Sequence, residues 1–156
     1  MLGVVPSPSA ILVVVVHRVE DMYAVTFKDE WKLENYACRG DAYRNTRTRL
    51  CDLIGDQSPE RICLKALEPV AVRNAANSWF LTAEIRGVIQ EAAASCGVEV
   101  ESRQRTAIGR MLGGKKVTEC LGNDSFWREL RMDVPKKFRE ACILSVASLR
   151  GEGRGV

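Results

Sequence analysis

The chain has 156 residues, of which 46% are hydrophobic and 28% charged, a composition typical of a globular protein with one core. Its 23 basic and 20 acidic residues leave a formal net charge of only +3, which excludes nucleic-acid binding through a high overall charge. The single histidine and the six cysteines form neither a CxxC motif nor a Cys/His cluster, so no zinc site is expected.

The cysteines stand at positions 38, 51, 63, 96, 120 and 142, without the spacing of a disulfide framework. Cys63, Cys96 and Cys142 fall in apolar positions, where we expect buried free thiols that pack as small hydrophobic side chains. This cysteine usage favours a reducing compartment such as the cytoplasm.

The amino-terminal part predicts a flexible leader at residues 1–10, followed by three strands. Ile11–His17 is apolar and β-branched, as in a strand covered on both faces, and it is too short to span a membrane. Met22–Phe27 predicts a second strand, and the alternation in Trp31–Cys38 predicts a third at the sheet edge. Tight turns between them indicate an antiparallel meander.

The middle of the chain predicts a helix, a strand and a second helix. The first helix covers about Ala42–Ile54, and Ile62–Leu67 is a short apolar run typical of a buried strand. Because a helix connects the two strands, we expect this strand to lie parallel to the first. Glu68 follows it, and a helix of about twenty residues then begins with Asn74 as N-cap and ends before Gly97.

The carboxyl-terminal part predicts a fifth strand at Val98–Glu101 and a final helix from Pro135 to about Leu149. Residues 11–150 are therefore expected to form one α/β domain, with a flexible tail at 151–156. Between strand and helix we expect three short helical segments, Thr106–Leu112, Lys115–Leu121 and Ser125–Leu130.

Three short motifs carry a resemblance to a known family. Leu67-Glu68-Pro-Val, Arg73-Asn74-Ala75 and Ile85-Arg86-Gly87-Val88 are similar to the central segment of the RuvC family of Holliday-junction resolvases, which have an RNase H-like fold. The resemblance implies a mixed five-stranded sheet of order 3-2-1-4-5 with helices on both faces. It also implies a homodimer that pairs through the 75–96 helix.

RuvC-like nucleases need about four carboxylates on two divalent ions. The family pattern I-L-G-I-D-P-G, placed on the strand from Ile11, puts Val15 at the aspartate position. Glu68 matches the family glutamate, and the pattern D-A-A-D-A-L-A puts Lys137 and Glu140 at the last two ligand positions. Two remnant acids predict a degenerate site without a metal, in which Lys137 pairs with Glu68 or Glu140.

Other acids leave a rival hypothesis open, because they could complete a displaced site that uses Mg²⁺ or Mn²⁺. Each also has an ordinary interpretation as an exposed turn residue. These acids are Glu20, Asp21, Asp124 and Asp133.

A basic segment resembles the family pattern V-K-x-x-V-x-G-x-G-x-A-x-K, which contacts the DNA backbone. A solvated surface is the alternative interpretation. The basic residues of the segment are Arg103, Arg105, Arg110, Lys115 and Lys116.

The sequence thus predicts a RuvC-like protein that binds branched or duplex DNA, or serves in assembly, and that has lost nuclease activity. No cofactor is expected. The rival functions are a structure-specific endonuclease, with Mg²⁺ or Mn²⁺ as cofactor, and a protein-interaction scaffold without affinity for DNA. We expect it in the cytoplasm or another reducing compartment that contains DNA.

Overall fold

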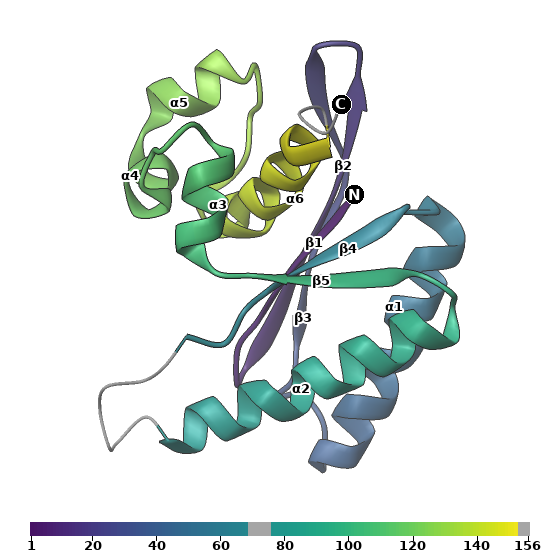
Figure 1. The fold of residues 1–156 in the computed structure, drawn as a ribbon. Helices are drawn as coiled ribbons and strands as arrows, with labels where there is room; N and C mark the ends of the chain where they lie inside the picture. The colour runs from purple at the N-terminus through teal and green to yellow at the C-terminus, as the bar shows by residue number, and fades with distance from the viewer. Residues whose placement is uncertain (69–75, 153–156) are drawn as a thin grey trace.

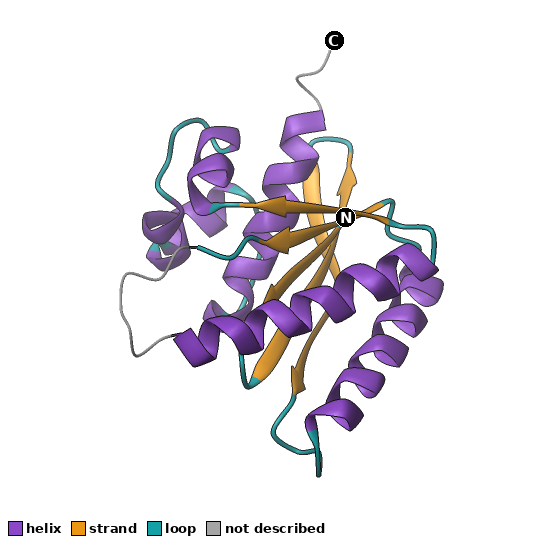
Figure 2. Cartoon of the chain, turned by 60° about the horizontal axis from the view of Figure 1, so that its bottom comes forward, coloured by secondary structure: helices purple, strands orange, loops and turns teal. Residues whose placement is uncertain are grey.

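A mixed sheet lies between two helical layers in the computed structural model, which describes residues 1–68 and 76–152 (Figures 1 and 2). The described strands form one five-stranded sheet of order β3-β2-β1-β4-β5. The outer pair β2 and β3 is antiparallel, as is β1 with β2, whereas β1, β4 and β5 run parallel. This confirms the expected order and mixed topology. The strands are β1 (Leu2–Pro6), β2 (Ala10–Val19), β3 (Met22–Lys32), β4 (Arg61–Lys65) and β5 (Glu99–Arg103).

The central strand is β1, so the prediction of a flexible leader at residues 1–10 is wrong. Two prolines close together suggested a loop, but Pro6 is the last residue of the strand and still pairs with Ile11. Beyond it, Ser7 closes a tight turn, in which its hydroxyl donates to the Ala10 carbonyl at 2.7 Å. The expected first strand is therefore β2.

The expected third strand at Trp31–Cys38 is also wrong. The second strand does not stop at Phe27 but continues as β3 to Lys32, and it stays paired with β2 throughout. Trp31 is buried because it belongs to this long strand, where its indole Nε1 donates to Asp29 at 3.1 Å. Three strands do precede the first helix, as predicted, but they are β1, β2 and β3.

Two long helices cover one face of the sheet, α1 (Arg39–Gln57) and α2 (Ala76–Ser95). α1 is longer at both ends than predicted, and Gly97 follows α2 with the positive φ expected of a residue past a helix end. The predicted N-cap of α2, Asn74, lies outside the described residues.

The other face carries α6 (Arg139–Glu152) and a group of short helices (Figure 2). α6 extends beyond Leu149 into the predicted tail, of which 153–156 lie outside the described residues. None of the described helices is long and apolar enough to cross a membrane. The short helices are α3 (Arg105–Met111), α4 (Val117–Gly122), α5 (Asp124–Glu129) and the 3-10 helix η2 (Lys136–Phe138).

Side chains of β1 point alternately to the two faces of the sheet, so β1 contributes to two hydrophobic clusters. Leu2 and Val4 pack with α1 and α2, whereas Val5 packs with α6 and the short helices. Gly3 lets α6 approach the sheet closely, because a side chain there would collide with the Ala141 carbonyl. This contact places Glu140, the preceding residue, beside the carboxyl end of the central strands.

Candidate functional site

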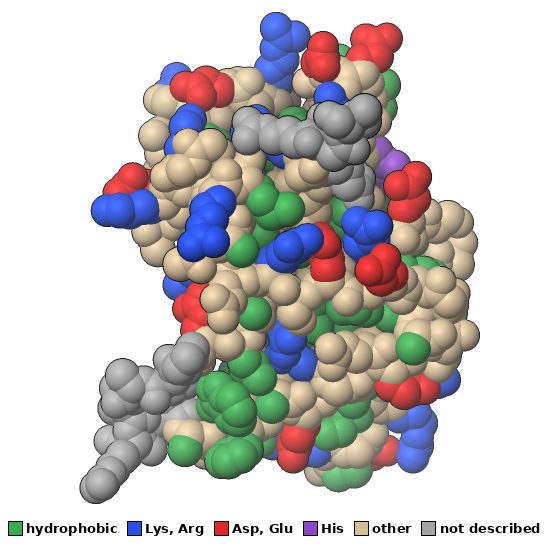
Figure 3. All heavy atoms as spheres, viewed as in Figure 1, with side chains coloured by type: hydrophobic (Ala, Val, Ile, Leu, Met, Phe, Trp, Pro, Cys, Tyr) green, Lys and Arg blue, Asp and Glu red, His purple; other side chains and the backbone are tan. Residues whose placement is uncertain are grey.

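A cavity of about 390 Å³ opens between α3, the following glycine loop and α4. Lys and Arg side chains gather on this part of the surface (Figure 3). Thr106 and Thr118 add hydroxyls to its wall. The structure thus brings together four of the five predicted basic residues: Arg105, Arg110, Lys115 and Lys116.

The glycine loop shapes this cavity. Gly113 and Gly114 have φ of +80° and +84°, a left-handed conformation that other residues adopt only with strain. Gly109 allows the loop to pack on α3, since an added Cβ would lie 2.6 Å from the Lys115 carbonyl. The two lysines that follow are therefore held at the cavity rim by backbone geometry.

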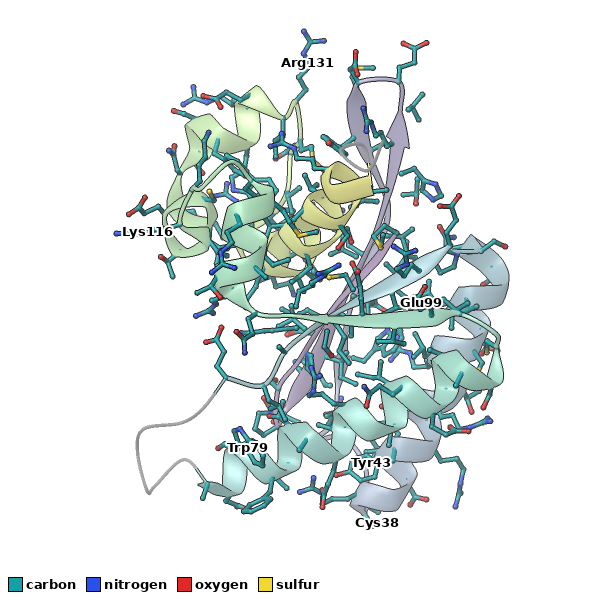
Figure 4. All side chains as sticks on the ribbon, in the orientation of Figure 1. Cys38, Tyr43, Trp79, Glu99, Lys116 and Arg131 are labelled. Atoms are coloured by element: carbon teal, nitrogen blue, oxygen red, sulfur yellow. The ribbon has the colours of Figure 1, made fainter. Side chains whose placement is uncertain are left out.

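The acidic partners of both lysines are exposed, and Lys115 also lies 5.3 Å from the centre of the buried Phe126 ring. Lys115 Nζ lies 3.7 Å from Glu129 and Lys116 Nζ 3.4 Å from Glu119, with 53% and 78% of the lysine side chains exposed. Lys116 projects away from the start of α4 in Figure 4. Exposed pairs of this kind contribute little energy, so both lysines are available to a phosphate.

Arg103 is not part of the cavity wall. It lies on β5, and its guanidinium donates to Glu101 at 2.6 Å. Burial raises the pKa of Glu101, but hydrogen bonds from Ser148 and Arg103 outweigh that effect and leave it below its ordinary value. The structure therefore places Arg103 in an ion pair at the edge of the sheet.

Glu140 is the centre of a half-buried ion network. Its Oε1 accepts from Lys65 Nζ at 2.9 Å and from Arg105 Nη2 at 2.7 Å, and 19% of its side chain is exposed. Burial would raise the pKa of this carboxyl, but the hydrogen bonds from Lys65 and Arg105 hold it below the ordinary range. In return, Glu140 raises the pKa of Arg105. Two fixed cations thus neutralise the carboxylate from β4 and α3.

Glu68 lies nearby but in a different environment. It follows β4 in an exposed position and lines a second cavity of about 270 Å³, together with Ser7, Lys65 and Trp79. Trp79 stands near the start of α2 in Figure 4. The charge of Glu68 contributes, less than Glu140 does, to the raised pKa of Arg105.

The fold and this arrangement can be compared with solved structures. Thermus thermophilus RuvC in complex with a Holliday-junction substrate superposes with a TM-score of 0.78 and 13% identity, over 99% of this chain and 95% of that chain. A second Thermus thermophilus RuvC structure gives 0.75 and 14%, over 99% and 95%. The yeast mitochondrial Holliday-junction resolvase Ydc2 gives 0.65 and 10%, over 97% and 78%.

The chain has a RuvC-like resolvase fold. This confirms the resemblance and the RNase H-like class predicted from the sequence. No protein-family model matches the sequence, and no curated protein matches it.

The order of the strands offers a second candidate for the first acidic position of the family pattern. Val15, the residue predicted there, lies on β2 and packs with α1 and α2, on the face opposite α6. The family pattern I-L-G-I-D-P-G instead fits the run from Met1 to Ser7, with Gly3 and Pro6 in frame. In this placement Val5 falls at the aspartate position of the pattern, and it is buried on the α6 face. The Leu-Gly and Pro spacing is the signal that sequence reasoning missed.

Lys137 does not pair with either remnant acid, so that prediction is wrong. Its Nζ lies 3.0 Å from Glu30 Oε2 on β3 and above the Phe138 ring. Cations do neutralise Glu140, but they are Lys65 and Arg105. No local pattern marks these two, because strand β4 and helix α3 meet α6 only in the folded chain.

The acids of a displaced site are dispersed. Asp124 accepts from Arg139 at 2.6 Å, and Asp21 lies in the β2–β3 turn, 3.6 Å from Arg18. Within residues 1–68 and 76–152, no group of three or more His, Cys, Asp or Glu side chains lies close enough to hold a metal ion. With Val5 apolar and Glu140 engaged by two cations, the described residues do not fit a two-metal centre.

Proposed function

We propose that this chain is a RuvC-like nucleic-acid-binding protein that has lost metal-dependent nuclease activity. The observation that carries the proposal is the position of Arg105. It neutralises Glu140, the remnant acid of α6, and it also forms part of the basic cavity wall. The same side chain thus disfavours a divalent cation and favours a phosphate.

The basic cavity supplies the binding chemistry. Arg105, Arg110, Lys115 and Lys116 present positive charge over one side of the molecule, and most protein–DNA contacts go to phosphate oxygens. Such contacts are independent of sequence and weaken steeply with salt. One neighbour of the same fold was solved with a Holliday-junction substrate, which supports branched or duplex DNA as the partner.

The proposed loss of cleavage rests on three of the four ligand positions, since only Glu68 is an acid free of these changes. Val5 offers no oxygen, Lys137 is itself a cation, and Glu140 shares its oxygen with Lys65 and Arg105. A divalent ion beside Glu140 would meet two positive charges within 3 Å of the carboxylate. The proposal therefore requires no metal cofactor.

A salt titration tests the binding part. Fluorescence anisotropy of a labelled four-way junction and of a matched duplex is measured against protein concentration, with EDTA and with Mg²⁺. We expect saturable binding whose logarithmic affinity falls linearly with the logarithm of salt concentration, without dependence on EDTA. Absence of binding at low salt would leave the protein-interaction scaffold as the better function.

The homodimer remains a proposal on weaker grounds. Phe80 on α2 is 59% exposed, and Gly87 on the same helix has open space where a side chain would lie. These features suit close approach of a second copy along α2. Sedimentation that gives the monomer mass at high concentration, or a dimer unaffected by Phe80→Glu, would remove this interface.

A further inference from the structure

Two cysteines, one in α1 and one just past the end of α2, lie at the same backbone carbonyl. The Cys51 thiol of α1 lies 3.9 Å from the carbonyl oxygen of Ala92 in α2. The backbone N–H of Cys96, just past the end of α2, donates to that same oxygen at 3.2 Å. Cys96 is close enough to Cys51 to raise the pKa of the Cys51 thiol.

The helices around this pair are held in place by a polar bridge. Arg47, one turn before Cys51, donates to Glu91 at 2.8 Å and to Ser95 at 3.3 Å. The Ser95 hydroxyl in turn donates to Glu91 Oε1 at 2.7 Å. Because both thiols sit beside this bridge, their proximity is a property of the α1–α2 contact and not of a free surface loop.

The prediction that Cys96 is buried is wrong: its side chain is exposed, and Cys51 is half-buried. The apolar run of α2 ends before Cys96, so the helix does not cover this residue. Cys63 and Cys142, by contrast, are buried, and burial raises the pKa of each thiol to about 12. Cys38 is exposed but precedes the first turn of α1, where its thiol donates to Asp41 (Figure 4).

We propose that Cys51 and Cys96 are an oxidation site that forms a reversible disulfide between α1 and α2, with hydroperoxides as the oxidant. The exposed Cys96 thiolate attacks the outer peroxide oxygen, the O–O bond breaks, and water or an alcohol leaves after protonation. Cys51 then attacks the Cys96 sulfenic sulfur, and hydroxide leaves with the Cys51 proton as water. Overall, two thiols and one hydroperoxide give one disulfide, one water and one alcohol or second water.

The environment assigns the order of these steps. Burial and then the neighbouring Cys96 raise the pKa of Cys51, against a smaller lowering by Arg47. Cys51 is therefore the less reactive thiol toward an external oxidant. It is well placed to act second, because its thiol and the backbone N–H of Cys96 lie at the same Ala92 carbonyl.

The test uses the full chain, reduced and then exposed to hydrogen peroxide, trapped with an alkylating agent and digested without reductant. We expect mass spectrometry to show one dominant cross-linked peptide pair that contains Cys51 and Cys96 and is released by dithiothreitol. Cys96→Ser should abolish the link and leave Cys51 largely unmodified, and Cys51→Ser should leave Cys96 as sulfenic acid, detected with dimedone.

A thermal melt adds a second readout. The oxidised wild-type chain should unfold at a higher temperature than the reduced chain, and neither serine variant should show this shift. Cys38→Ser is the matched control, since it removes an exposed thiol at the far end of α1 and should leave both the link and the shift intact. Recovery of Cys51 and Cys96 only as separate species, or links spread over other cysteines, would overturn the proposal.

This inference is independent of the proposed function. Cys51 and Cys96 lie with α1 and α2 on one face of the sheet, whereas α3 and α4, which form the basic cavity, lie on the other (Figure 1). Oxidation should therefore leave affinity for DNA unchanged, and a failure of either proposal leaves the other standing.

Discussion

The Glu140 network and the basic cavity share Arg105 but differ in how their positively charged side chains are paired. At Glu140, two cations are fixed by a half-buried carboxylate at 2.7 and 2.9 Å. At the cavity rim, the acidic partners of Lys115 and Lys116 are exposed and lie at 3.4 Å or more. Positive charge stabilises the protein in the first region and is available to a ligand in the second.

Under the proposed function, this difference means that DNA binding and DNA cleavage depend on separate parts of the fold. Val5 and the ion-paired Glu140 lie outside the glycine loop that presents Lys115 and Lys116. Variants that act on one region but not the other can break or sharpen the comparison.

The largest expected effect is on DNA affinity. Changing both cavity lysines, Lys115→Glu with Lys116→Glu, should weaken binding to a four-way junction by roughly 100-fold and reduce the salt slope by about two. The matched control is Lys28→Glu with Lys32→Glu, the same charge change on the opposite sheet edge. Equal affinity losses in both double variants would mean that only net charge matters and not the cavity.

The second effect is on folding stability. Glu140→Gln leaves Lys65 and Arg105 without their shared carboxylate, which should lower the free energy of unfolding by roughly 2 kcal/mol, below the range for a fully buried pair. Urea denaturation measures the loss. Glu119→Gln removes only an exposed pair with Lys116 and should change stability by less than about 0.5 kcal/mol. If the two variants unfold at the same urea concentration, the Glu140 ion network contributes no more to stability than an exposed pair does.

The third effect depends on pH. The pKa of Glu140 in the folded chain lies below its ordinary value of 4.5, so the ionised carboxylate favours the folded state at neutral pH. This stabilisation is lost as the pH falls from about the ordinary value through the folded pKa. Urea midpoints across the acid range should therefore fall less steeply for Glu140→Gln than for the wild type. Parallel curves would contradict the assignment of the lowered pKa.

The smallest effect is expected at Lys137. Its pair with Glu30 is exposed, so Lys137→Met should change stability by less than about 1 kcal/mol and leave DNA affinity unchanged. Differential scanning calorimetry and the anisotropy assay measure the two quantities. A loss of stability as large as that of Glu140→Gln would mean that Lys137 contributes to the ion network after all.

Much of the architecture was predictable, because the long helices and the run Ile62–Leu67 have clear periodicity and clear ends. The central strand was not, since Leu2–Pro6 is only five residues long and ends in a proline. Because that strand was missed, the predicted first and second strands are β2 and β3, and the family pattern was placed on β2 at Val15.

The site was predictable in part. Glu140 and four cavity cations follow from sequence patterns, because the patterns are local. The partners of Glu140 do not, since Lys65 and Arg105 are distant in sequence and reach it only through the packing of β4, α3 and α6. Predicting an ion network of this kind requires the tertiary contacts themselves.

The most direct test of the central claim is a cleavage assay on bound DNA. A labelled four-way junction is saturated with protein, as verified by anisotropy, and incubated with Mg²⁺ or Mn²⁺ before denaturing electrophoresis. The account predicts full binding with no more cleavage than the double variant Glu68→Gln with Glu140→Gln produces. Strand cleavage that requires the metal and disappears in that variant would contradict it and establish an active nuclease.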